Sequence, residues 1–210
     1  MATTERMTVT KALSELKLLD KRITKLVDDT TFVTHAIGSD PPREARSLAE
    51  FGARSKANYQ GARDLMRRRA AIKAAVVQSN AGTTLEVAGR TYVVAEAIER
   101  KASVAYENRL ITRLRTDLAR ARQEVERENE RAKSRLDSQA QALLGKENAR
   151  GAEYEALYKS FMDRNAPKLV DPLDAQQEVE TLERDVDDFL AEVDQALSVS
   201  NALTQIDVQY

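Results

Sequence analysis

The chain has 210 residues, of which 42% are hydrophobic, 5% aromatic and 32% charged, and its 33 basic and 34 acidic side chains leave a net charge of −1. Only 7 Gly and 4 Pro interrupt a sequence rich in Ala, Leu, Glu and Arg, a composition typical of long helices because these residues lose little rotamer freedom in a helix. The composition excludes a β-sandwich, a barrel or a doubly wound sheet, and the near-zero charge excludes a large overall field toward nucleic acid or a membrane.

The N-terminal part of the chain predicts two helices with a short strand between them. Apolar residues recur every three or four positions after Thr8, as on one face of a helix. Ser47 and Glu50 have the spacing of a capping box, in which each side chain accepts the other's free backbone N–H. The expected elements are helices over about 9–29 and 47–79 and a strand over about 31–37.

The C-terminal part predicts a hairpin, three more helices and a last strand. Two short β-favouring runs flank Ala88-Gly89, which indicates a tight turn. Asp171-Pro172 predicts a helix start with Pro at the first helical position, and the apolar residues that follow step by three and four like a heptad seam. The expected elements are strands over about 83–87, 90–93 and 203–208 and helices over about 94–144, 152–165 and 172–199.

The most specific feature is an internal repeat, S-N-A-x-T-x-[LI]-[ED]-V, which follows two of the long helices. Its shared positions are Ser79, Asn80, Ala81 and Thr83 in the first copy and Ser200, Asn201, Ala202 and Thr204 in the second. We expect the Asn residues to end the helices in the left-handed conformation and the following residues to form strands. The 203–208 strand should then pair with the 84–93 hairpin, with 31–37 as a further neighbour. A binding loop built on the two Asn residues is the alternative.

Catalytic chemistry has little support in the sequence. His35 is the single histidine and Cys is absent, so Ser–His–Asp, Cys–His and multi-His metal sites cannot form within the chain. The Gly-rich phosphate loops are missing as well. The carboxylates lie on helix faces opposite the apolar seams, where solvation explains them. We therefore expect a protein that is not an enzyme and binds no cofactor or metal.

Candidate interaction surfaces come from charge and aromatic residues. Basic residues dominate 43–73 and acidic residues dominate 171–194, so the two blocks are expected to attract each other within the fold or between subunits. The aromatic residues around 154–161 either fold back as core or dock a neighbour. The candidate residues are Arg63, Arg67, Arg68, Arg69, Lys73, Tyr154, Tyr158, Phe161, Asp185 and Asp188. Nucleic-acid binding through Arg67–Arg69 is an alternative without a supporting motif.

Three runs of sequence resemble structural proteins of tailed bacteriophages. They are Ser79-Asn80-Ala81, residues 94–101 (VAEAIERK) and residues 196–202 (ALSVSNA). The likeness covers residues 9–208 and implies a virion component of the neck, tail or baseplate that assembles with copies of itself. It brings no defined binding site. The chain is also similar, more weakly, to small bacterial helical-hairpin proteins.

These observations together predict a mainly α, single elongated domain over 1–210, an antiparallel long-helix bundle or coiled coil with a small sheet of three or four strands at one end. The expected function is that of a non-enzymatic virion assembly subunit, made in the host cytoplasm, whose partners are copies of itself and other virion proteins. Met1–Arg6 lacks the pattern of a secretory signal, and no apolar run is long enough to span a bilayer. The rivals are a cytoplasmic adaptor or inhibitor of one protein and a nucleic-acid-organising protein.

Overall fold

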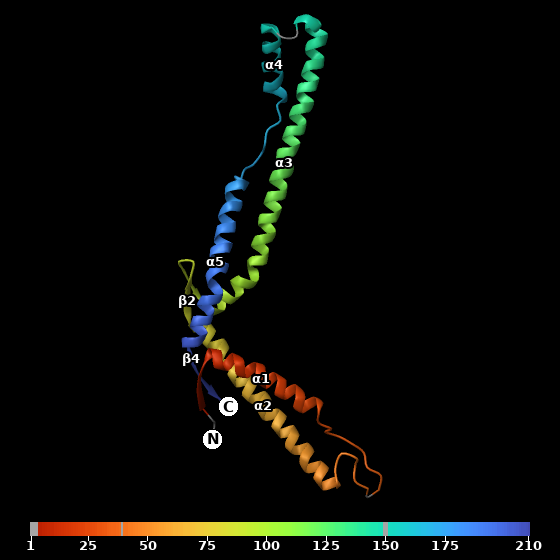
Figure 1. Ribbon diagram of the computed structural model, residues 1–210, viewed down its shortest axis with the longest axis vertical. Helices are drawn as coiled ribbons and strands as arrows, with labels where there is room; N and C mark the ends of the chain where they lie inside the picture. Colours follow the sequence, from red (N-terminus) through yellow and green to blue (C-terminus); the bar gives the residue numbers. More distant parts are fainter. Residues whose placement is uncertain (1–3, 39, 149–150) are drawn as a thin grey trace. The chain divides into compact units, whose positions relative to one another are not determined.

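The computed structural model describes residues 4–38, 40–148 and 151–210, and side chains within these ranges except for 144–148. It is mainly helical, as expected, with four short strands (Figure 1). The elements in chain order are β1 (Thr4–Thr8), α1 (Val9–Asp28), α2 (Leu48–Gly82), β2 (Thr84–Val87), β3 (Arg90–Val93), α3 (Val94–Asn148), α4 (Ala152–Asn165), α5 (Ala175–Leu203) and β4 (Gln205–Gln209).

The chain divides into two compact units, which are described separately. Unit 1 holds Met1–Ala102 and Phe189–Tyr210, and unit 2 holds Ser103–Asp188. Unit 1 contains all four strands, α1, α2, the start of α3 and the end of α5. The packing of three long helices as one antiparallel bundle stays a prediction.

The strands form two separate antiparallel pairs, β1 with β4 and β2 with β3. The expectation of one sheet with three or four strands is therefore wrong. The C-terminal strand pairs with β1, which the sequence did not predict, and not with the 84–93 hairpin. The strand expected over 31–37 is also wrong, because these residues have no strand structure. In the part of the chain that the structure describes, no strand pairs with this alternating segment.

Helix α1 begins where predicted because Thr8 caps it. The Thr8 hydroxyl accepts a hydrogen bond from the N–H of Lys11 at 3.2 Å. One face of α1 then packs against α2, and Leu16 and Leu19 are buried in a core shared with Ile72 and Val76 of α2. Met7, Ile206 and Val208 extend this core beneath the β1–β4 pair.

Helix α2 begins at the predicted capping box, with one difference. The Ser47 hydroxyl accepts from the N–H of Glu50 at 3.1 Å, whereas the Glu50 carboxylate accepts from the N–H of Arg46 and not from that of Ser47. The two side chains therefore accept one N–H group of the helix, that of Glu50, and one N–H group that precedes the helix, that of Arg46.

The β2–β3 hairpin turns at Ala88-Gly89, as predicted. Both residues have positive φ, 51° and 70°, which is the requirement of a two-residue type I′ turn. Gly adopts this conformation freely, but in Ala88 it is strained because the Cβ comes close to the following carbonyl oxygen. Its N–H donates to the Glu192 carboxylate at 2.7 Å, so α5 holds the strained residue in place.

The repeat recurs as a structural repeat at the ends of α2 and α5. Each helix leads through one extended Thr into a strand, and the partner strands have the same register. Leu85 pairs with Tyr92 as Ile206 pairs with Met7. The partner strand runs directly into a helix in both cases, and the first N–H of that helix donates to the Thr carbonyl: Val94 to Thr83 at 2.8 Å and Val9 to Thr204 at 3.0 Å. Unit 1 is thus built from two copies of one strand–helix arrangement.

Unit 2 consists of most of α3, all of α4 and the first half of α5. Ala132, Leu136 and Ala140 of α3 are buried, as are Val179 and Val186 of the predicted α5 seam. Arg115 of α3 forms an ion pair with Glu183 of α5 at 2.6 Å.

Helix α4 spans the predicted residues, whereas α5 begins three residues later than predicted. Pro172 is not the first helical residue, because Asp174 has a positive φ of 51° and the helix starts at Ala175. The Asp171 carboxylate still accepts from the N–H of Ala175, at 2.9 Å, as a helix cap would.

Candidate interaction site

The basic residues singled out on α2 are engaged within unit 1. Arg67 pairs with Asp64 at 3.3 Å, and Arg69 pairs with Asp20 of α1. The hydrogen bond from Arg69 to Asp20 raises the pKa of the guanidinium above its usual value. The Arg69 contact joins α2 to α1, whereas the Arg67 contact lies within α2.

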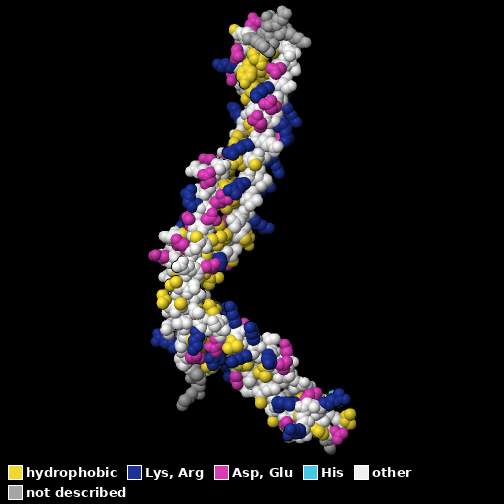
Figure 2. Space-filling model, viewed as in Figure 1, with side chains coloured by type: hydrophobic (Ala, Val, Ile, Leu, Met, Phe, Trp, Pro, Cys, Tyr) yellow, Lys and Arg dark blue, Asp and Glu magenta, His cyan; other side chains and the backbone are white. Residues whose placement is uncertain are grey.

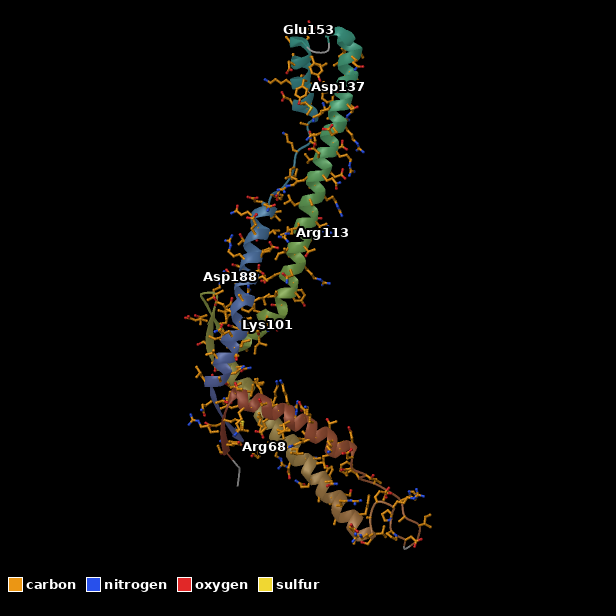
Figure 3. The ribbon with its side chains drawn as sticks, viewed as in Figure 1. Arg68, Lys101, Arg113, Asp137, Glu153 and Asp188 are labelled. Atoms are coloured by element: carbon orange, nitrogen blue, oxygen red, sulfur yellow. The ribbon has the colours of Figure 1, made fainter. Side chains whose placement is uncertain are left out.

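Arg68, which is labelled in Figure 3, is the centre of a polar cluster in unit 1. Its guanidinium lies 2.8 Å from the Glu5 carboxylate and 2.6 Å from that of Glu15, and it donates to the Tyr210 hydroxyl at 2.7 Å. It also lies over the Tyr210 ring, 4.8 Å from the centroid. Arg68 therefore ties both terminal strands to α2 and α1.

The two remaining basic candidates are exposed on α2. Arg63 donates to the Tyr59 hydroxyl at 3.2 Å, one helical turn away. Lys73 lies on the exposed side of α2, next to the buried Ile72. Arg63 and Lys73 stay candidates for contacts outside the chain.

The aromatic candidates on α4 are partly tied back to α3. The Tyr154 hydroxyl donates to the Asp137 carboxylate at 3.0 Å, and this hydrogen bond raises the pKa of the phenol above its usual value of 10.0. The Tyr154 and Tyr158 rings lie 6.5 Å apart. Tyr154 and Phe161 are half-buried, whereas Tyr158 is 37% exposed. The structure thus favours the fold-back interpretation for Tyr154.

The acidic candidates lie on the part of α5 that belongs to unit 2. Asp185 is half-buried and Asp188 is exposed. Figure 3 labels Asp188 on α5. The basic candidates lie in unit 1, and the ion pairs of Arg67–Arg69 go to β1, α1 and α2 itself. The ion pairs of these three arginines are therefore with carboxylates outside the acidic block 171–194.

The repeat residues act at the helix ends, although not as predicted. The carbonyls of Ser79 and Ser200 accept the N–H groups of Thr83 and Thr204, both at 2.9 Å. Asn80 and Asn201 are helical, and neither has the positive φ that was expected. Each helix is followed directly by a Thr, and Thr83 is extended, with φ −90° and ψ 134°. Both Asn side chains are half-buried, whereas Ala81 and Ala202 are exposed.

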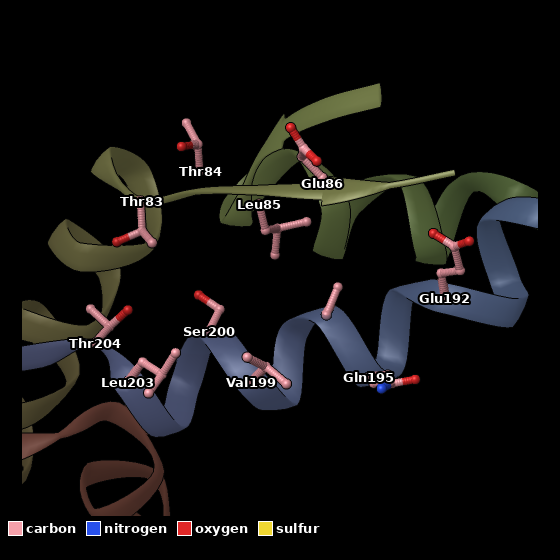
Figure 4. Close-up of a pocket in the computed structure, with 11 residues that line it drawn as sticks. Thr83, Thr84, Leu85, Glu86, Glu192, Gln195, Val199, Ser200, Leu203 and Thr204 are labelled. Atoms are coloured by element: carbon pink, nitrogen blue, oxygen red, sulfur yellow. The ribbon is translucent and has the colours of Figure 1, made fainter. Parts of the chain in front are cut away.

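An open groove lies between β2 and the last turns of α5, and we call it the β2–α5 groove (Figure 4). Its volume is about 620 Å³. Leu85 extends from β2 toward α5, and Ala196, Val199 and Leu203 of α5 complete an apolar lining. Val199 is 51% exposed and Leu203 is 75% exposed. Two large apolar side chains are thus left in water at a concave surface.

Polar groups border this apolar lining. Thr83, Ser200 and Thr204 lie toward the end where the helices stop, and Glu86, Glu192 and Gln195 lie toward the other end. Glu86 and Glu192 are exposed. The groove therefore offers apolar contacts along its length and negative charge at one end.

The structural repeat places a second groove at the equivalent position between α2 and β4, which we call the α2–β4 groove. Its volume is about 380 Å³. Gln78 stands where the first groove has Val199, and Gly82 where it has Leu203, while Ser79 and Thr83 correspond to Ser200 and Thr204. One copy of the arrangement is therefore apolar and the other polar.

The sequence interpretation missed the β2–α5 groove and strand β1, but signals for both exist in the sequence. The repeat copies differ at Gln78 and Val199, which points to the groove. The first residues of α1 and α3 are also repeated, as Val9-x-x-Ala12-Leu13 and Val94-x-x-Ala97-Ile98. This repeat points to β1, which precedes α1, as the counterpart of β3, which precedes α3.

Among the residues that the structure describes, no group of three or more His, Cys, Asp or Glu side chains is placed to hold a metal ion. Over the same residues, no helix combines the length and the apolar character needed to cross a membrane. No protein-family model, no curated protein and no solved structure matches this chain.

Proposed function

We propose that this chain is a non-enzymatic assembly subunit that acts through protein–protein contacts, in a bacteriophage virion as the sequence resemblance implies. The observation that carries the proposal is the β2–α5 groove, in which Val199 and Leu203 stay exposed at a concave surface of a single chain. Apolar side chains gathered in this way are typical of a surface that another protein covers.

Further apolar side chains on the helices support the same interpretation. Leu18 of α1 is 46% exposed, and Tyr106 and Leu110 of α3 are 72% and 50% exposed. Figure 2 shows hydrophobic side chains at the surface among charged ones. A mixed surface of this kind suits specific contacts with proteins, because apolar groups supply affinity and charges select the partner.

Mass spectrometry of purified particles tests the proposal. Particles from cells that carry the gene are banded in a density gradient, washed at high salt and quantified for this chain against a known virion protein. We expect a fixed copy number that survives the wash. A chain found only in the cell lysate, bound to one host protein, would support the adaptor instead.

Nucleic-acid binding is checked in the same material. Binding through phosphate contacts weakens by orders of magnitude between low and physiological salt. Because Arg67–Arg69 are engaged with carboxylates, we expect no such salt-dependent binding to duplex or single-stranded DNA. Strong low-salt binding that is lost in Arg67→Ala would contradict the proposal.

A further inference from the structure

Two features of unit 1 have an open side that no strand covers among the described residues, and they have complementary chemistry. The first is β2, which pairs only with β3 in the described part of the chain and borders the apolar β2–α5 groove with its other side. The second is the segment Thr30–Gly38, whose sequence pattern is that of a strand but which forms none. From these features we infer that Thr30–Gly38 of one copy docks along β2 of a second copy and places Val33 and Ile37 in the β2–α5 groove.

The apolar character of the groove is not needed to build the fold. The α2–β4 groove has the same helix exit and the same strand register, yet it has Gln78 and Gly82 where the first groove has Val199 and Leu203. Since the polar copy is equally well formed, the apolar copy requires another explanation. An occupant that removes Val199 and Leu203 from water supplies one.

The segment Thr30–Gly38 presents one face for such a contact. Phe32 and Thr34 are half-buried, and the Phe32 carbonyl accepts a hydrogen bond from Ser55 of α2 at 2.7 Å. The alternate residues face outward, with Val33 87% and Ile37 77% exposed. The segment is therefore held beside α2 through Phe32, while Val33 and Ile37 stay exposed to solvent.

The dimensions of the two features agree. Val33 and Ile37 lie on one face of an extended chain, about 13 Å apart. The wall of the groove formed by α5 runs from Glu192 to Leu203, about 17 Å along the helix. A five-residue strand thus fits within the groove and matches the four residues of β2.

The charges of the two features are also complementary. Thr30–Gly38 contains no Asp, Glu, Lys or Arg, as an apolar groove requires, and it is followed by the exposed Arg43 and Arg46. The groove carries the exposed carboxylates Glu86 and Glu192 at one end. Arg43 and Arg46 belong to the basic block of the sequence and Glu192 to the acidic block, so the contact would use these blocks for attraction between subunits, one of the two alternatives that the sequence left open.

The occupant has to come from a second copy. Helix α1 starts beside the groove, where Val9 donates to the Thr204 carbonyl, and its 20 residues carry the chain about 30 Å away before Thr30. A segment held at the far end of a helix cannot return to its own groove. The contact joins different surfaces of the two copies, so it is heterologous and builds rings or open chains of subunits.

This inference rests on the proposed function and gives it a geometry. One added strand with two anchoring side chains buries less than the roughly 1,200 Å² of a stable interface, so the affinity of a single contact should be low. Sedimentation of the full chain from about 5 to 300 µM is the appropriate measurement. We expect a weight-average mass that rises with concentration and passes beyond that of a dimer.

Each of two variants removes one side of the contact, either the segment or the groove. Val33→Gln/Ile37→Gln removes the anchors, and Val199→Gln gives the groove the residue of its polar counterpart. Loss of a buried apolar anchor should weaken association about tenfold or more. Val77→Gln is the matched control. Val77 lies near the C-terminal end of α2 and is 55% exposed, as Val199 is near the end of α5, but it does not line the groove. It should associate like the wild type.

Mixing the two variants gives the decisive result. The first variant keeps an intact groove and the second keeps an intact segment, so an equimolar mixture can form one contact and should stop at a dimer. Monomers in the mixture, or wild-type association by Val33→Gln/Ile37→Gln, would overturn the inference. A strict monomer for the wild type over the whole concentration range would overturn it too. None of these results bears on whether the chain is found in purified particles, so the two proposals fail separately.

Discussion

Replacing Arg68 by Ala should release the terminal strands from unit 1. Arg68 contacts Glu5 of β1, Glu15 of α1 and Tyr210 beyond β4, at 2.6–2.8 Å. The side chains of Arg68, Glu5 and Glu15 are only 29%, 29% and 18% exposed, so solvent screens these pairs less than pairs on an open surface. The substitution also leaves Glu5 and Glu15 as neighbouring like charges, although Glu5 keeps its ion pair with Lys11 at 3.3 Å.

The expected loss can be estimated from these contacts. An exposed ion pair contributes about 0–1 kcal/mol, whereas breaking a fully buried pair costs about 3–5 kcal/mol. Two partly buried pairs and one hydrogen bond from a charged donor place Arg68→Ala between these limits, at about 2 kcal/mol. This loss corresponds to a roughly 30-fold larger equilibrium population of the open strand pair, and therefore to roughly 30-fold faster amide exchange.

Hydrogen exchange of the β1 and β4 amides, followed by mass spectrometry, measures this opening directly. Arg67→Ala is the matched control, because Arg67 is 62% exposed and pairs with Asp64 on its own helix. It should change the exchange rates by less than a factor of about three. If Arg68→Ala also stays within that factor, Arg68 does not hold the terminal strands and the argument is refuted.

Three further predictions concern other parts of the chain. Ala88→Asn should raise the stability of unit 1 by about 1 kcal/mol, because Asn tolerates the positive φ of the type I′ turn, and a lower thermal midpoint would contradict this. Leu19→Ala should cost about 2–5 kcal/mol in urea unfolding, because Leu19 is 2% exposed in the α1–α2 core, and a cost below 1 kcal/mol would show that this core collapses around the cavity. The Tyr154 phenol should titrate above the usual pKa of 10.0, which the absorbance difference between the wild type and Tyr154→Phe measures. Since folding raises this pKa, the hydrogen bond to Asp137 stabilises unit 2 fully below pH 10 and is lost as the pH rises through the folded value, so an unshifted titration would refute the contact.

The sequence alone determined the features that depend on near neighbours. Thr8 and Ser47 mark helix starts because capping joins residues three apart, and Ala88-Gly89 marks a turn because two adjacent residues must adopt positive φ. The repeat correctly indicated that α2 and α5 both lead into strands. It gave the wrong reason, since the helices end without a left-handed Asn.

Only the tertiary structure decided which distant segments meet. Strand pairing joins Met7 to Ile206, and no local pattern identifies the partner of a strand across the whole chain. The same limit explains why 31–37, with a strand pattern but no neighbouring edge, forms no strand. It also explains why Arg68, one of three consecutive arginines, is the one that holds the terminal strands. A β-strand and a polar cluster are completed by contacts between residues far apart in sequence, whereas a helix satisfies its own backbone hydrogen bonds within a few residues.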